Sequence, residues 1–269
     1  MSGFAFDRDG VLSYVALGDS FSEGLSDPYP DSAETPHGHF RGWADRLAER
    51  LADEVRELRY ANLAVRGRLA RQIVTEQVPR AEQLQPDLVT LAAGGNDILR
   101  PGGDPDQIAT IVDQGISRLR ATGAHVVLFT GIDPEFQPVM RPLRGKIAVY
   151  NMHLRAIADA HDCSVVDLWA MRVLGDARAW SWDRLHHSSE GHRRIALRVC
   201  EVLGVDPGAD WREPWPESPQ VAWADARRAD ARWAREFLVP WIGRRLTGRS
   251  SGDGVSPKRP DLAPLRVSG

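Results

Sequence analysis

Short apolar runs alternate with amphipathic stretches along most of the chain. Five runs of aliphatic and β-branched residues predict buried strands, over residues 12–17, 60–65, 87–93, 124–130 and 163–168. A different spacing, one apolar residue every three or four positions, predicts a helix with one apolar face. That spacing is set by Trp43, Leu47, Leu51, Val55 and Leu58. Further helices are predicted over residues 68–84, 104–123, 144–161 and 190–203.

This alternation of strands and helices implies a parallel sheet that is covered by helices on both faces. We therefore predict a three-layer α/β/α, doubly wound domain with five parallel strands, within a catalytic unit of residues 1–208. For the strand order 2-1-3-4-5, ligands bind in the crevice beyond the carboxyl ends of strands one and three, where the strand order reverses.

The C-terminal part of the chain has a different composition. Residues 209–246 are predicted to form a Trp-rich helical extension, with a helix over residues 220–238. Residues 247–269 are rich in Ser, Gly, Pro and basic residues, which predicts a disordered tail. From residue 219 to residue 269 there are ten Lys and Arg against five Asp and Glu. Packing of the tryptophans on the catalytic domain is the favoured interpretation, and weak contact of the tail with anionic surfaces is the alternative.

The net charge, the N-terminal residues and the cysteines restrict the kinds of partner and the cellular location that we expect. The net charge of −3 gives no general attraction to nucleic acid, and there is no basic and apolar leader at the N-terminus. The two cysteines, Cys163 and Cys200, lie in apolar stretches and are expected to be buried thiols. We expect a soluble, cytoplasmic protein without a metal ion.

Four short polar segments follow predicted strands, and each offers groups for acyl chemistry. They are Gly-Asp-Ser ending at Ser20, Asn-Leu-Ala-Val-Arg-Gly ending at Gly67, Gly-Gly-Asn-Asp around Asn96, and Asp183 to His186. A serine hydroxyl is a weak nucleophile at neutral pH and needs an imidazole to accept its proton. His186 can do this, and Asp183 can hold the imidazole in one tautomer. The backbone N–H groups of Ser20 and Gly67 and the Asn96 amide can stabilise an oxyanion.

The same four segments resemble the four sequence blocks of the SGNH hydrolase superfamily, also called GDSL esterases and lipases. The run of residues 183–195 and the tail are similar to those of actinobacterial members. The resemblance implies a flavodoxin-like fold and hydrolysis of small-molecule carboxylic esters without a cofactor. The wider α/β-hydrolase class is not indicated, because the chain has no Gly-x-Ser-x-Gly elbow.

Several alternatives stay open at this level. His187 and His192 are the other candidates for the base beside Ser20. An acyltransferase would use the same triad, and a non-catalytic interaction protein would keep only the fold. The loops over residues 98–104 and 131–140 are expected to line the substrate pocket.

Overall fold

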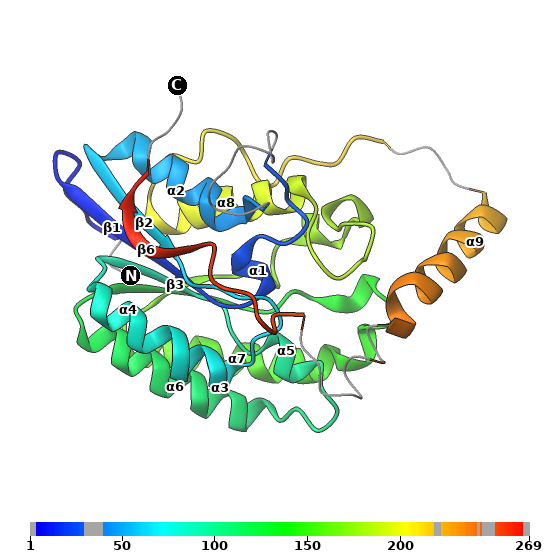
Figure 1. Cartoon of the computed structure of the whole chain (residues 1–269). Helices are drawn as coiled ribbons and strands as arrows, with labels where there is room; N and C mark the ends of the chain where they lie inside the picture. The colour runs from blue at the N-terminus through cyan, green and yellow to red at the C-terminus, as the bar shows by residue number, and fades with distance from the viewer. Residues whose placement is uncertain (1–3, 30–39, 218–221, 241–242, 244–250, 266–269) are drawn as a thin grey trace.

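The computed structural model describes residues 4–29, 40–217, 222–240, 243 and 251–265. Its centre is a six-stranded sheet in the order β5-β4-β3-β1-β2-β6, with helices on both faces (Figure 1). β1 to β5 run parallel in the order 2-1-3-4-5, as in the flavodoxin-like fold that the resemblance implies, and β6 is antiparallel to β2. The strands are β1 (Val11–Leu17), β2 (Glu57–Asn62), β3 (Leu88–Leu91), β4 (His125–Phe129), β5 (Ser164–Val166) and β6 (Arg259–Pro264).

Two apolar clusters form the core, one on each face of the sheet. Alternate residues of β1 point to opposite faces: Tyr14 lies in the cluster with α2 and α8, and Val15 lies in the cluster with α6 and α7. Both side chains are fully buried. The helices are α1 (Ser20–Glu23), α2 (Gly42–Glu54), α3 (Ala70–Gln72), α4 (Val78–Leu84), α5 (Gly95–Ile98), α6 (Pro105–Ala121), α7 (Arg144–Ala160), α8 (Ser189–Leu203) and α9 (Trp223–Trp233).

The predicted doubly wound α/β fold is confirmed, and the strand count and the tail need correction. We predicted five strands and a disordered tail, whereas residues 259–264 form the sixth strand at the edge of the sheet. The two prolines of this segment hid it, because proline cannot donate a backbone hydrogen bond and is tolerated in a sheet only at an edge. The backbone N–H of Leu265 donates to the Leu58 carbonyl (2.8 Å) and extends this pairing.

A buried ion pair anchors the last strand to the domain. Lys258 Nζ lies 2.8 Å from Asp45 Oδ1, and both side chains are almost fully buried. The ammonium also donates to the carbonyls of Phe40 and Arg41. Burial lowers the pKa of Lys258, although Asp45 opposes that effect. One basic residue of the tail is therefore neutralised inside the protein and does not contribute to attraction toward anionic surfaces.

The Trp-rich extension contains helix α9 and the π-helical turn η6 (Ala234–Leu238), within the predicted range. Trp211 is buried, and the Trp215 indole donates to the Val173 carbonyl (2.8 Å), as expected for packing on the catalytic domain. Trp223 is 78% exposed, and Trp241 lies outside the described residues. Within the described ranges, we find no helix long and apolar enough to cross a membrane.

We predict that Lys258→Met lowers the free energy of unfolding by about 3–5 kcal/mol, because it leaves the Asp45 carboxylate buried without its cation. Urea denaturation measures this. Asp261→Asn is the control, since it breaks the more exposed pair of the same strand with Arg80 and should cost at most about 1 kcal/mol. Equal losses in the two variants would contradict the anchoring role.

Candidate functional site

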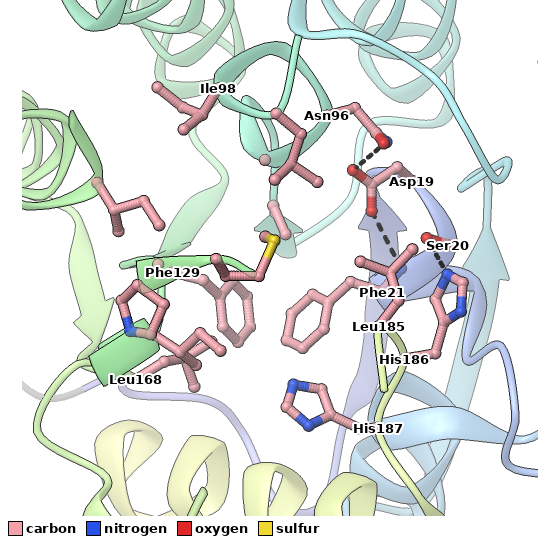
Figure 2. Close-up of a pocket in the computed structure, with 18 of the residues that line it drawn as sticks. Asp19, Ser20, Phe21, Asn96, Ile98, Phe129, Leu168, Leu185, His186 and His187 are labelled. Atoms are coloured by element: carbon pink, nitrogen blue, oxygen red, sulfur yellow. Dashed lines mark hydrogen bonds between the residues drawn. The ribbon is translucent and has the colours of Figure 1, made fainter. Parts of the chain in front are cut away.

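The carboxyl ends of the strands bring the predicted site residues to one edge of the sheet. Ser20 begins α1 directly after β1, and Asn96 lies on α5 directly after β3. Gly67 follows β2, and His186 lies in the loop between β5 and α8. Figure 2 shows Ser20, Asn96 and His186 around one pocket. This is the crevice that the strand order predicts.

Ser20, His186 and Asp183 form a continuous chain of hydrogen bonds. Ser20 Oγ lies 3.1 Å from His186 Nε2, and His186 Nδ1 lies 2.6 Å from Asp183 Oδ2 (Figure 2 shows the Ser20 contact). Both distances are within hydrogen-bonding range. The arrangement therefore has a hydroxyl, an imidazole that can take its proton and a carboxylate that orients the imidazole.

The two other candidate histidines are directed to different partners. His187 is buried, and its Nδ1 lies 3.3 Å from the Ala179 carbonyl. Burial lowers the pKa of His187 to about 3, so its ring is neutral at pH 7. His192 is also buried, with Nδ1 accepting from the Trp43 N–H (3.2 Å), and burial lowers its pKa to about 4. These rings pack the core and leave His186 as the imidazole at Ser20.

Asp183 is held by donors that the sequence did not reveal. Its Oδ1 accepts from Ser181 Oγ (2.6 Å) and from the backbone N–H groups of Leu185 and His186. Burial raises the pKa of this carboxyl, but the hydrogen bonds from His186 and Ser181 outweigh burial and hold the pKa well below its usual range. Asp183 is consequently ionised at neutral pH and can stabilise a positive charge on His186.

Another carboxylate, Asp19, is more deeply buried than Asp183 and orients the Asn96 amide. Asn96 Nδ2 donates to Asp19 Oδ2 (2.9 Å) and to the Arg68 carbonyl (3.1 Å). Asp19 Oδ1 accepts from the Phe21 N–H (3.0 Å), which is the turn-forming role that Asp after Gly often has. Burial raises the pKa of Asp19 to about 6, against the opposing effects of the Phe21 N–H and His186. Asp19 therefore links the turn before Ser20 to the helix that carries Asn96 (Figure 2).

The turn before Ser20 is clamped by Gln77, which sequence reasoning missed. The Gln77 amide accepts from the Gly18 N–H and donates to the Gly18 carbonyl, both at 2.8 Å. Gly18 has φ +148°, and a Cβ there would lie 2.7 Å from the Ala92 carbonyl oxygen. Gln77 ends a π-helical turn, η1 (Ile73–Gln77), within the stretch predicted as one regular helix. Such turns are frequent at functional sites, but no sequence pattern marks this one.

Gly67 lies beside α1 in a loop that an ion pair fixes. The N–H of the preceding residue, Arg66, donates to Glu23 Oε2 (2.7 Å), and its guanidinium pairs with the same carboxylate. Gly67 has φ +74°, a left-handed conformation that favours glycine. The loop thus holds the Gly67 backbone at the wall of a cavity that also contains Ser20.

Two cavities meet at Ser20 and His186. The smaller has a volume of about 240 Å³ and reaches core residues at the strand ends, including Phe129 and Leu168 (Figure 2). The larger, about 810 Å³, extends toward the C-terminal helix. The loops over residues 98–104 and 131–140 contribute to both linings, as predicted, through Ile98, Leu99, Arg100, Pro134, Gln137, Val139 and Met140.

Comparison with known proteins decides the family. The model of the GDSL-like lipase/acylhydrolase family matches residues 16–194. The chain belongs to this family. Its relatives include a GDSL esterase/lipase, WDL1, from Oryza sativa subsp. japonica, which is 25% identical over 64% of this chain and 75% of the relative. Esterase TesA from Pseudomonas aeruginosa is 31% identical over 61% of this chain and 78% of the relative.

Solved structures confirm the fold of this family member. The crystal structure of TesA superposes with a TM-score of 0.58 and 24% identity, over 71% of this chain and 97% of TesA. Axe2, an acetylxylan esterase from Geobacillus stearothermophilus, has a TM-score of 0.60 and 19% identity, over 78% of this chain and all of Axe2. As a family member, the chain is a carboxylic ester hydrolase, and the interpretation as a non-catalytic interaction protein is set aside.

We predict that the ionised form of Asp19 destabilises the folded chain. The pKa of Asp19 is raised from 3.8 to about 6 by folding, so its contribution to stability is present below about pH 4 and lost as the pH rises through about 6. Relative to Asp19→Asn, the free energy of unfolding of the native chain should fall by about 2 kcal/mol between pH 4 and pH 7. Urea denaturation of both proteins at several pH values measures this, and parallel curves would contradict it.

Proposed function

We propose that this carboxylic ester hydrolase works through an acyl-enzyme on Ser20, with His186 as general base and acid. The observation that carries the proposal is the chain of hydrogen bonds from Ser20 Oγ through His186 to Asp183, placed where two cavities meet. The electrostatic part of the argument is the depressed pKa of Asp183, which keeps a negative charge behind the imidazole.

In the first half of the proposed reaction, Ser20 Oγ attacks the ester carbonyl carbon and its proton passes to His186 Nε2. The carbonyl oxygen becomes an oxyanion, which accepts hydrogen bonds from the Ser20 and Gly67 N–H groups and from Asn96. Because Asp19 and Arg68 already accept from the two N–H groups of the Asn96 amide, that amide is oriented before substrate arrives, and one N–H forms a bifurcated hydrogen bond to its present acceptor and to the oxyanion. The tetrahedral adduct then expels the alkoxide, and His186 protonates it.

In the second half, water attacks the acyl-enzyme carbonyl. His186 accepts a proton from the water, the bond to Ser20 Oγ breaks, and His186 returns the proton to Oγ. The carboxylic acid leaves and the starting state is restored. No cofactor takes part in these steps. An acyltransferase would follow the same path with an alcohol in place of water.

We predict that Ser20→Ala lowers kcat by at least about 10³-fold on p-nitrophenyl esters from acetate to palmitate, because the acyl-enzyme cannot form. Ser13→Ala, at the other end of β1, is the matched control and should retain activity. Mass spectrometry of the native chain after a brief exposure to substrate should detect an acyl group on Ser20.

Hydrolysis surviving in Ser20→Ala would remove Ser20 as the nucleophile. Product analysis with added methanol separates the two acceptors. Free acid as the main product supports water, whereas the methyl ester as the main product would favour acyl transfer.

A further inference from the structure

The C-terminal helical arm, defined as α9 and η6 (residues 223–238), lies apart from the layered domain (Figure 1). One side of this arm is partly buried and the other is exposed. The partly buried side carries residues spaced three, four or seven positions apart, which is the pattern of one helix face. They are Ala226, Asp230, Trp233, Ala234, Phe237 and Leu238.

This face touches the loop that carries the proposed acid–base residues. The Trp233 indole Nε1–H donates to the Asp183 carbonyl (2.8 Å). Beside it, Arg184 pairs with Asp230 (2.8 Å) and its guanidinium lies 5.0 Å from the Trp233 ring centroid. Phe237 meets Trp182 edge-on, with ring centroids 3.8 Å apart. The arm is thus attached to the Asp183 loop through side chains.

Between these attachments and the rest of the domain lies the larger cavity, of about 810 Å³. Trp233, Phe237 and Leu238 form its outer wall, and the segment of residues 137–143 lies among its other walls. Ser20 and His186 also line this cavity, so it is continuous with the reaction centre. Its volume is in the range of sites that hold a small molecule.

We propose that the C-terminal arm builds a second substrate compartment beside Ser20, in which Trp233 and Phe237 hold a long apolar chain of the ester. The inference rests on the ester hydrolysis proposed for Ser20. A chain in this compartment would cover the apolar side of the arm, which the domain itself leaves only partly buried.

Arginine side chains line part of the compartment, and carboxylates pair with most of them. Arg66 is paired with Glu23, and Arg184 and Arg227 both pair with Asp230. Asp230 carries one negative charge against two guanidinium groups, so a net positive charge remains at this part of the lining, to which Arg100 also belongs. The remaining walls include many apolar side chains, among them Leu99, Val139, Met140, Leu143, Phe237 and Leu238.

The test compares long-chain and short-chain esters in Phe237→Ala. We expect kcat/KM for a long-chain ester to fall about tenfold, with the value for a short-chain ester within about twofold of the native chain. Two series identify which end of the ester occupies the compartment: p-nitrophenyl laurate against acetate varies the acyl chain, and dodecyl acetate against ethyl acetate varies the alcohol. A selective loss in either series supports the proposal, and equal or absent losses in both would overturn it.

Trp223→Ala is the matched control on the same helix, because Trp223 is 78% exposed. It should leave both chain lengths within about twofold of the native chain. A loss as large as that in Phe237→Ala would show that the compartment wall does not act through Phe237.

Trp233→Phe keeps an aromatic wall without the N–H donor, so it should retain the preference for long chains that Trp233→Ala loses.

A binding measurement keeps this proposal separate from the one for Ser20. Calorimetry with Ser20→Ala, titrated with dodecanoic acid and with dodecanol, needs no catalysis. We expect Ser20→Ala/Phe237→Ala to bind at least one of these probes about tenfold more weakly. Weakened binding, together with ester hydrolysis that survives in Ser20→Ala, would retain the compartment and reject the mechanism. Equal binding by Ser20→Ala and Ser20→Ala/Phe237→Ala, together with an effect of Phe237→Ala on hydrolysis that does not depend on chain length, would reject the compartment and retain the mechanism.

Discussion

The hydrogen bond between Ser20 Oγ and His186 Nε2 joins groups that are 166 residues apart in the chain. It can form only if the end of β1 and the loop before α8 meet within about 0.5 Å of the required position. Other hydrogen bonds of the site hold both of these segments in position. Gln77 clamps both backbone groups of Gly18 just before Ser20, and Ser181 with two backbone N–H groups fixes the Asp183 carboxylate on the other side.

The pKa values of the two carboxylates of the site are shifted in opposite directions. Asp183 receives enough hydrogen bonds to remain ionised in spite of burial. Asp19 is buried with fewer donors, so its pKa is raised to about 6 and its ionised form costs stability. The Asp19 carboxylate and the Arg68 carbonyl both accept hydrogen bonds from the Asn96 amide, and together they fix its orientation. A site that stabilises an oxyanion depends on donors that are oriented in advance.

The C-terminal part of the chain completes both the domain and the site. β6 closes one edge of the sheet, and Lys258 brings a cation to the buried Asp45. N-terminal to β6, the side chains of Trp233 and Asp230 attach the helical arm to the loop that contains Asp183 and Arg184. In the proposed arrangement, the segment that differs most in composition from the rest of the chain supplies a wall of the substrate site. Chain-length preference would then depend on residues beyond the region that the family model matches.

The alternating pattern of apolar runs and helices predicts the doubly wound fold, and the four polar segments at strand ends predict which residues meet at Ser20. Period and composition are local signals, and parallel strands necessarily bring their carboxyl ends to one edge. The sequence favours His186 as the imidazole at Ser20 but leaves His187 and His192 as alternatives, and the folded chain excludes these two because burial places them in the core with other partners. Only the tertiary structure decided the roles of Gln77, Lys258 and Trp233. Their partners lie far away in the chain, and a contact of that kind leaves no periodic pattern in the sequence.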